Sequence, residues 1–151
     1  QKWKGEGRAI TTGTSVIADA GYSVEGYDTS LRATREDVLK VVAAGAADLV
    51  DVRAPAKYSG ELLAPTNLPQ EGSQRGGHIP GAANIPWASA VNEADGTFKP
   101  AGELRRIYGD RGIDGERDTI AYCRIGERSS HTWFVLTQVL GYTNVINYDG
   151  S

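Results

Sequence analysis

The sequence contains very few of the side chains that bind metals or form cross-links. Its 151 residues include one cysteine, two histidines and no methionine. The single cysteine, Cys123, excludes an internal disulfide, a CxxC redox motif and a cysteine-rich zinc site. His78 and His131 are too few and too scattered to suggest a metal site on their own. We therefore expect neither a metal nor another cofactor.

Long apolar segments and a strong net charge are also absent. No apolar run approaches the roughly 18 residues of a membrane-spanning helix, and residues 1–5 do not have the pattern of a signal peptide. The net charge of −3 and the pI near 5.4 argue against a general binder of nucleic acids or membrane surfaces. We expect a cytoplasmic protein with no nucleic-acid and no membrane partner.

Regular patterns begin near residue 34. Residues 1–30 are rich in Gly, Ser, Thr and charged side chains, which is typical of a linker. Thr34 and Asp37 then form the start signal of a helix that Gly45 can end. We expect strands over 48–53, 82–87, 119–122 and 144–148, helices over 34–45, 100–108 and 128–140, a helical turn over 54–58 and a long loop over 62–77.

This alternation of strands and helices predicts an α/β domain, in which helices cover both faces of a parallel sheet. Ligands of open α/β sheets bind at the carboxyl ends of the strands. The strand predicted over 119–122 ends at Cys123, so it delivers the thiol to that edge. The short loop after Cys123 leads directly into a helix N-terminus.

The residues of this loop suit an ionised sulfur. A tight loop can point successive backbone N–H groups inward, and Gly126 permits the positive φ that such a loop requires. The helix N-terminus adds about half a positive charge, and Arg124 and Arg128 add formal charge. An unperturbed cysteine is only about 3% thiolate at pH 7. We expect the loop to lower the pKa of Cys123 and to stabilise an added, negatively charged sulfur.

Three motifs stand out in the sequence. The first is the loop Cys-Arg-Ile-Gly-Glu-Arg-Ser at 123–129. The other two are Asp-Val-Arg at 51–53 with Tyr-Ser-Gly-Glu at 58–61, and Gly-His-Ile-Pro-Gly-Ala at 77–82 leading to Asn-Ile-Pro at 84–86. Together they resemble the motifs of the rhodanese family, the thiosulfate sulfurtransferases, in which the first is the active-site loop. The motifs occur in the family's order, and the resemblance covers residues 31–151. It implies a rhodanese-like open parallel β-sheet with helices on both faces.

The resemblance implies that Cys123 is the nucleophile of a sulfurtransferase. It would take sulfur from a small anionic donor as a persulfide and pass it to cyanide or a thiol. Arg124 implies thiosulfate as the donor, because the mercaptopyruvate enzymes of the family carry Gly there. Ile125 departs from the Lys of the animal-type loop, which leaves the donor open. The resemblance implies that the substrate-binding positions of the loop are Arg124, Ile125, Gly126, Glu127, Arg128 and Ser129. Residues 125–129 would contribute backbone N–H groups. The Arg128 side chain is expected to brace the loop, and the Glu127 side chain is expected to point outward.

Two further substrate-binding positions follow from the resemblance. Lys57 stands where catalytic second domains carry a substrate-contacting Arg, and it offers a point charge without the bidentate fork of Arg. Trp87 matches a position that contributes an aromatic wall to the pocket, with ordinary core packing as the alternative.

The remaining motif residues are assigned to structural support. Asp51, Arg53 and Glu61 are expected to form an ion-pair network that holds the strand ends behind the loop. We expect His78 to cap or bond backbone in its turn and His131 to lie on the helix surface, with neither taking part in the chemistry.

The resemblance also implies a domain organisation. Residues 1–30 resemble the end of a preceding rhodanese domain and an interdomain linker, and residues 31–151 resemble the catalytic second domain of a tandem enzyme, cut at its C-terminus. The first rhodanese domain of such a full-length chain is an expected partner.

Other functions use related features. A phosphatase or arsenate reductase of the same fold has a Cys-x5-Arg loop, one residue longer than the Cys-x4-Arg of this chain. A non-catalytic rhodanese module commonly lacks the cysteine or the basic loop, and both are present here. A mercaptopyruvate-type donor and a relay of sulfur between proteins use the same residues and stay open.

Overall fold

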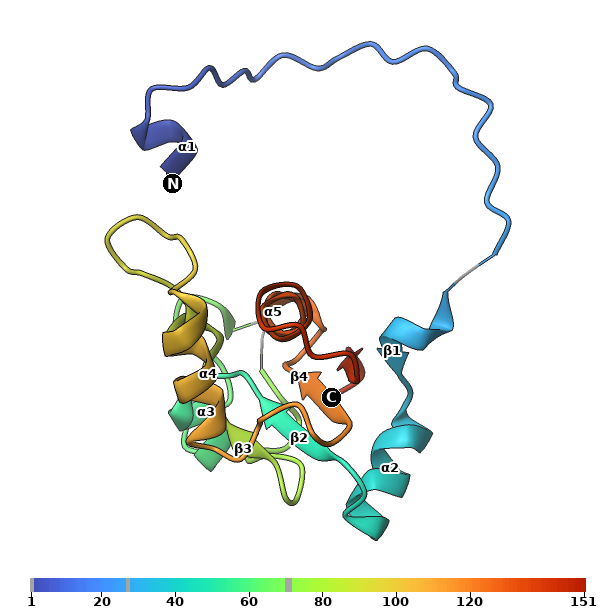
Figure 1. The fold of residues 1–151 in the computed structure, drawn as a ribbon, viewed down its shortest axis with the longest axis vertical. Coiled ribbons are helices and arrows are strands. Elements are labelled where there is room, and N and C mark those ends of the chain that lie inside the picture. Colours follow the sequence, from blue (N-terminus) through green and yellow to red (C-terminus); the bar gives the residue numbers. More distant parts are fainter. Residues whose placement is uncertain (1, 27, 70–71) are drawn as a thin grey trace.

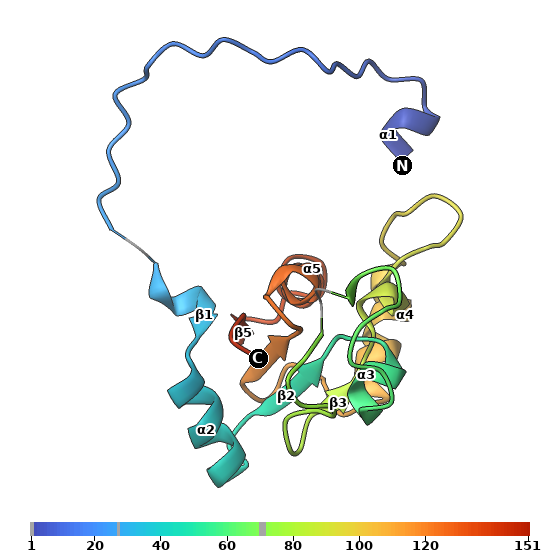
Figure 2. The same cartoon turned by 180° about the vertical axis from the view of Figure 1, so that it is seen from behind.

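The computed structural model describes residues 2–26, 28–69 and 72–151. At its centre lies a sheet of five parallel strands in the order β1-β5-β4-β2-β3 (Figures 1 and 2). In the register of the central strand, Tyr122 lies opposite Asp51 of β2 and opposite Tyr148 of β5. Because the pairing is parallel, the carboxyl ends of all strands lie at one edge. The strands are β1 Arg32–Ala33, β2 Asp48–Asp51, β3 Ala83–Asn84, β4 Thr119–Tyr122 and β5 Val145–Tyr148.

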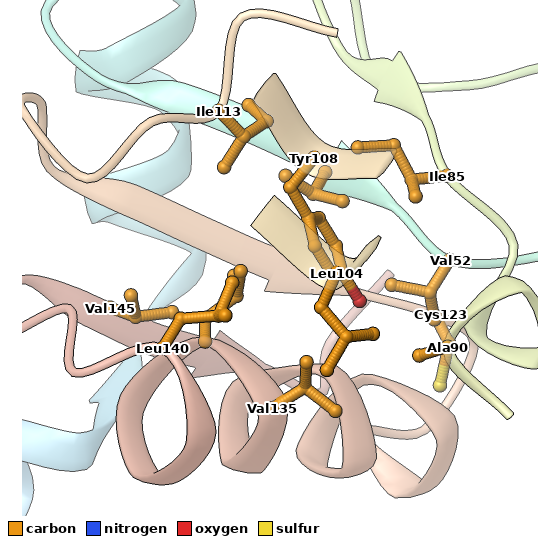
Figure 3. Close-up of a cluster of buried hydrophobic side chains, with 12 residues drawn as sticks. Val52, Ile85, Ala90, Leu104, Tyr108, Ile113, Cys123, Val135, Leu140 and Val145 are labelled. Carbon is orange, nitrogen blue, oxygen red and sulfur yellow. The ribbon is translucent and has the colours of Figure 1, made fainter. Parts of the chain in front are cut away.

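Alternate residues of the central strands face opposite sides of the sheet and build two cores. Ile120 and Tyr122 of β4 belong to the core that α2 covers with Val38, whereas Cys123 belongs to the core that α4 and α5 cover (Figure 3). Helices thus lie on both faces, and the predicted α/β fold is confirmed. The helices are α1 Lys2–Gly5, η1 Thr29–Leu31, α2 Arg35–Ala44, α3 Pro55–Ser59, η3 Trp87–Ala90, α4 Ala101–Gly109, α5 Glu127–Phe134 and the π-helix η4 Val135–Val139.

The predicted start of α2 is confirmed in atomic detail. The Thr34 hydroxyl accepts a hydrogen bond from the Asp37 backbone N–H, and the Asp37 carboxylate accepts one from the Thr34 backbone N–H at 3.0 Å. This reciprocal arrangement satisfies two backbone donors at the helix start. Gly45 ends the helix in the left-handed conformation, as the sequence predicted.

Several predicted boundaries were wrong. The strand predicted over 82–87 is only Ala83–Asn84, because Pro86 lacks the N–H that a strand needs and the chain turns into η3. The strand predicted over 48–53 ends at Asp51. The helix predicted from Arg128 begins one residue earlier, and its second half widens into η4, where Leu140 N–H donates to Val135 O at 3.0 Å. The two-residue strand β1 was not predicted, because two residues carry no periodic pattern.

The segment before β1 differs from the rest of the chain. Apart from α1 and η1, its described residues have no regular secondary structure, and Figure 1 shows residues 8–26 as an arm that arches away from the sheet. The predicted domain boundary near residue 30 stays a prediction. Among the described residues, no helix has both the length and the apolar character needed to span a bilayer.

Truncation of a side chain in the core beneath α5 is predicted to destabilise the fold. Leu136 is fully buried, whereas Leu39 on the outer side of α2 is 54% exposed. Leu136→Ala is expected to lower the free energy of unfolding by about 3 kcal/mol, because the substitution removes buried apolar contacts and leaves a cavity. Leu39→Ala, the matched control, is expected to change it by less than about 1 kcal/mol. Urea unfolding followed by circular dichroism measures both, and equal losses would contradict the assignment of this core.

Candidate active site

Cys123 occupies the carboxyl edge of the sheet. It directly follows β4, and beside it Val52 N–H donates to Tyr122 O at 3.1 Å, which continues the pairing of β2 with β4 past the last strand residue. Its side chain is only 1% exposed, and its carbonyl accepts a hydrogen bond from the Ser151 hydroxyl. The sulfur is therefore held in a fixed and largely dehydrated position.

The loop after Cys123 stabilises the ionised form of this sulfur. Burial raises the pKa of the Cys123 thiol, but hydrogen bonds from the backbone N–H groups of Ser129, Ile125 and Arg128 and from the Ser129 hydroxyl outweigh it. The pKa of Cys123 therefore lies below its ordinary value. Backbone donors that converge on one point form an anion-binding nest, and here the anion is the thiolate itself.

Gly126 makes this loop possible. Its φ is +81°, and a Cβ at this position would lie 2.7 Å from Cβ of Asp149. A side chain would therefore be both strained and obstructed. Asn147 Nδ2 donates to the Gly126 carbonyl at 3.2 Å, and Asp149 pairs with Arg32 of β1 at 3.0 Å. The segment at the end of β5 thus holds the loop from behind.

Asn147, Asp149 and Ser151 were not predicted to take part in this site. The available signal was topological: if the strand over 144–148 lies beside the strand over 119–122, the residues after both strands meet at the same edge. The sequence alone did not establish which strands are neighbours.

The charged side chains of the loop differ in position. Arg124 and Arg128 are half-buried, and Ile125 is 52% exposed. Glu127 is exposed, as expected, so its carboxylate does not oppose ionisation of the sulfur from within the loop. Glu127, at the first position of α5, also lies where a helix favours a negative charge.

Asp51 and Arg53 form a buried ion pair behind the thiol. Asp51 is fully buried, and Arg53 Nη2 donates to its Oδ2 at 2.5 Å while Nε donates to its Oδ1 at 2.9 Å. The hydrogen bond to Asp51 is the main cause of the raised pKa of Arg53, and the charge of Cys123 contributes to the rise. Arg53 Nη2 also donates to Gly77 O at 2.7 Å, which ties the end of the long loop to β2.

Glu61 is not a member of this network, so its expected place there was wrong. Its side chain is exposed, and its backbone N–H donates to the Ser59 hydroxyl at 3.4 Å. Among the described residues, no ion pair joins it to Asp51 or Arg53. Glu61 follows the end of α3 at Ser59, whereas Asp51 and Arg53 lie at the end of β2.

Lys57 lies on α3 and is buried, with 7% of its surface exposed. A buried ammonium group is costly without compensating partners, so this position is not that of an ordinary surface lysine. Since α3 starts four residues after β2 ends, Lys57 lies at the same sheet edge as Cys123. The long loop returns to this helix, because a Cβ on Gly60 would lie 2.9 Å from the backbone nitrogen of Gly77.

Trp87 and His131 belong to an aromatic group between η3 and α5. The two rings meet edge to face with centroids 5.4 Å apart, and the Phe98 ring lies 4.9 Å from His131. Trp87 is 37% exposed and is not a core residue. His131 was predicted to lie on the helix surface, but it is half-buried among these aromatic rings, and this burial lowers its pKa.

His78 bonds backbone, as expected, although its partner lies on another element. His78 Nδ1 and Tyr58 O are hydrogen-bonded at 2.8 Å, and the His78 ring stacks on the Tyr58 ring at 3.6 Å. Tyr58 in turn donates to Ala82 O at 2.7 Å. These contacts fasten the segment 77–82 to α3.

The arrangement suits nucleophilic chemistry at sulfur. It combines a buried cysteine, converging backbone donors and a basic loop. Over the described part of the chain, no group of three or more His, Cys, Asp or Glu side chains is placed to hold a metal ion. The candidate reactive group in this geometry is the sulfur of Cys123.

Comparisons with known proteins agree with this geometry. The Rhodanese-like domain family matches residues 34–151. A relative from Saccharopolyspora erythraea, named "Putative thiosulfate sulfurtransferase", is 56% identical over 151 residues, which are 100% of this chain and 53% of that protein. The "Sulfur carrier protein TtuD" of Thermus thermophilus is 54% identical over 154 residues, covering 100% of this chain and 54% of that protein.

A solved structure extends the agreement to three dimensions. The crystal structure of SseA from Escherichia coli, described as a 3-mercaptopyruvate sulfotransferase with the "rhodanese" fold, superposes with a TM-score of 0.80. It is 26% identical in sequence, and the match covers 99% of this chain and 52% of that one. The chain spans about half the length of the curated relatives it matches. On the evidence of this fold, this loop and these relatives, the chain belongs to the rhodanese family of sulfurtransferases.

Proposed function

We propose that the chain transfers sulfane sulfur from thiosulfate to cyanide or a thiol through a persulfide on Cys123. The observation that carries this proposal is the convergence of loop donors on a buried sulfur, which lowers the pKa of Cys123. Thiolate, and not thiol, is the nucleophile in exchange reactions at sulfur. The same donors suit the terminal sulfur of a persulfide, which also carries negative charge.

The reaction has two displacement steps. In the first, the Cys123 thiolate attacks the outer sulfur of thiosulfate, an S–S bond forms, and the S–S bond of the donor breaks so that sulfite leaves with the electron pair. In the second, cyanide or a thiolate attacks the outer sulfur of the persulfide, and the Cys123 thiolate leaves with the electron pair. The second step yields thiocyanate when cyanide is the acceptor and a new persulfide when a thiol is the acceptor. Neither step needs an external oxidant or reductant.

We assign the anionic donor to the positive groups at the sheet edge. Arg124 and Lys57 would attract it, and Trp87 would form part of the pocket wall. Donors such as mercaptopyruvate would use the same thiolate, and the family relatives include proteins named for either donor. Arg124 favours thiosulfate, because a guanidinium group can donate two parallel hydrogen bonds to two oxygens of the tetrahedral sulfonate-like end of this anion.

A protein thiol is an alternative acceptor. One relative with 54% identity is named a sulfur carrier protein, which favours relay of sulfur between proteins as a second candidate function. We further propose that residues 31–151 form the catalytic half of a two-domain chain whose first rhodanese domain is a partner, since the chain spans about half of its relatives. A free, ionised thiol is best preserved in a reducing compartment, which supports a cytoplasmic location.

The central prediction concerns the persulfide. Incubation with thiosulfate is expected to add one sulfur, about 32 Da, to the intact mass, because one cysteine can hold one outer sulfur. Cyanide should remove the adduct, and Cys123→Ser should not form it. Hydrolysis of a phosphate ester with no sulfur adduct would instead support the phosphatase alternative.

Replacement of Gly126 by a larger residue is predicted to reduce both the reactivity and the ionisation of Cys123. Gly126→Ala places a Cβ against Asp149 and requires a strained φ, so the loop donors move away from the sulfur. Persulfide formation should fall by about tenfold or more. The pKa of Cys123 should rise toward that of a free thiol, so that half-maximal alkylation by iodoacetamide moves to higher pH.

Gly102→Ala is the matched control for this variant. Gly102 lies in α4 without a positive φ, and a Cβ added there would meet no atom within 4 Å. The substitution should leave the persulfide yield and the alkylation midpoint unchanged. An unaltered midpoint in Gly126→Ala would show that the loop donors do not set the ionisation of Cys123.

The charge of Arg124 is predicted to make the chain selective for an anionic sulfur donor. Arg124→Ala should lower kcat/KM for thiosulfate by about tenfold, the effect of one lost charged contact. The loss should be smaller for a neutral persulfide donor. Arg106→Ala, on the exposed side of α4 where Arg106 pairs with Asp110 at 3.6 Å, is the control for the change in net charge. Equal losses for both variants would indicate only a general effect of protein charge.

A further inference from the structure

Asn147 lies on β5, the strand beside the one that delivers Cys123. In the register of the sheet it lies opposite Ala121 of β4. Since alternate residues of a strand share a face, Asn147 faces the same side of the sheet as Val145, whose core cluster includes Cys123. The side-chain amide of Asn147 meets the active-site loop at Gly126, immediately before α5 begins.

The Gly126 carbonyl accepts two hydrogen bonds, one from α5 and one from β5. Ser130 N–H of α5 donates to it at 2.8 Å, and Asn147 Nδ2 donates to it at 3.2 Å. The bond from Ser130 has the spacing of an α-helical bond, so this carbonyl points along α5 toward the C-terminal end of the helix. The N–H groups of the first helical turn point the opposite way, toward the loop. A carbonyl fixed in this direction therefore also fixes the direction of those donors.

Gly126 is the N-cap of α5, and it has no side chain with which to bond the N–H groups of the first turn. This leaves the N–H groups of Arg128 and Ser129 available to Cys123, whose pKa they lower. Glycine is also the residue whose backbone rotates most freely. Rotation of the Gly126 carbonyl toward the sulfur would place its partial negative charge against a thiolate. Asn147 opposes that rotation from a strand outside the loop.

The oxygen of the same amide has a cost in stability. Asn147 Oδ1 is buried, and within the described part of the chain it has no hydrogen-bond partner. A buried acceptor without a partner destabilises a protein, whereas an apolar side chain of the same shape leaves no polar atom unpaired. Leucine has nearly the same branched shape as asparagine. Stability alone therefore does not favour asparagine at this position, and the Nδ2 donor is the group that does.

We propose that Asn147 is a positioning residue that holds the Gly126 carbonyl in place and thereby keeps the N–H groups of the loop directed at the Cys123 sulfur. The inference rests on the proposed function, in which that sulfur reacts as a thiolate and then carries a second sulfur. Asn147 acts through the loop and not on the sulfur itself, because its amide bonds the carbonyl side of the Gly126 peptide.

The variants used to test this role leave the charges around Cys123 unchanged. The charged and titratable groups concerned come from each element near the thiol. They are Asp51 and Arg53 at the end of β2, Lys57 on α3, Tyr108 on α4, Tyr122 on β4, Arg124, Glu127 and Arg128 on the loop, His131 on α5 and Asp149 after β5. Asp149 keeps its ion pair with Arg32, at 3.0 Å, in every variant.

The test compares the pH dependence of Cys123 alkylation by iodoacetamide, followed by intact mass, with the temperature of thermal unfolding. Asn147→Leu keeps the shape of the side chain and removes both the Nδ2 donor and the unpaired oxygen. We expect the pH of half-maximal alkylation to rise by about half a unit, equivalent to roughly threefold less thiolate at neutral pH. The temperature of unfolding should stay the same or rise.

Asn144→Leu is the matched control. Asn144 lies just before the amino end of β5, away from the loop, and its buried Oδ1 also lacks a hydrogen-bond partner among the described residues. This substitution should leave the alkylation midpoint unchanged. If Asn147→Leu does not fold, Asn147→Ala, which removes the same donor without adding an apolar group, decides the outcome.

An unchanged midpoint in the folded Asn147 variant would overturn the proposal, with or without a change in its temperature of unfolding. An equal rise in the Asn147 and Asn144 variants would overturn it as well, because the effect would then not depend on the loop contact. Alkylation uses no sulfur donor. The proposed function fails separately, if the unsubstituted chain gains no sulfur from thiosulfate.

Discussion

The convergence of backbone N–H groups on one buried sulfur is the interaction on which the rest of this site depends. Burial alone would keep Cys123 protonated, since a charge in an apolar surrounding is unfavourable. The N–H groups of Ile125, Arg128 and Ser129 reverse that preference because they are fixed in place before any charge develops. A dry environment also strengthens each of these hydrogen bonds. Burial and loop donors therefore act together, and the sulfur ionises more readily than a free thiol while it stays protected from solvent.

The sheet supplies the rigidity that this loop requires. Parallel pairing of β4 with β2 and β5 brings the Asp51–Arg53 ion pair to one side of the loop and the segment after β5 to the other. Asn147 holds the carbonyl of Gly126, and Asp149 leaves space only for a glycine there. The loop is short, but contacts distant in sequence determine its shape. Sites supported in this way keep their geometry better than sites on unsupported loops.

Local signals predicted some elements well and others poorly. The α2 helix was predictable because Thr34, Asp37 and Gly45 specify its ends through contacts within a few residues. The strand over 119–122 was predictable because a fully buried strand is apolar throughout. In contrast, β1 is too short to show a period, and η4 widens within a segment whose pattern is that of an ordinary helix. Tertiary packing decides such cases.

The amino-acid sequence by itself determined the α/β class, the position of Cys123 at the end of a strand, and a basic, glycine-containing turn leading into a helix. These features are local, so neighbouring residues are sufficient to specify them. Only the tertiary structure decided that Glu61 lies apart from Asp51 and Arg53, and that His131 packs among aromatic rings. Those relations join residues far apart along the chain, and they depend on strand order and on which faces of the helices meet the sheet.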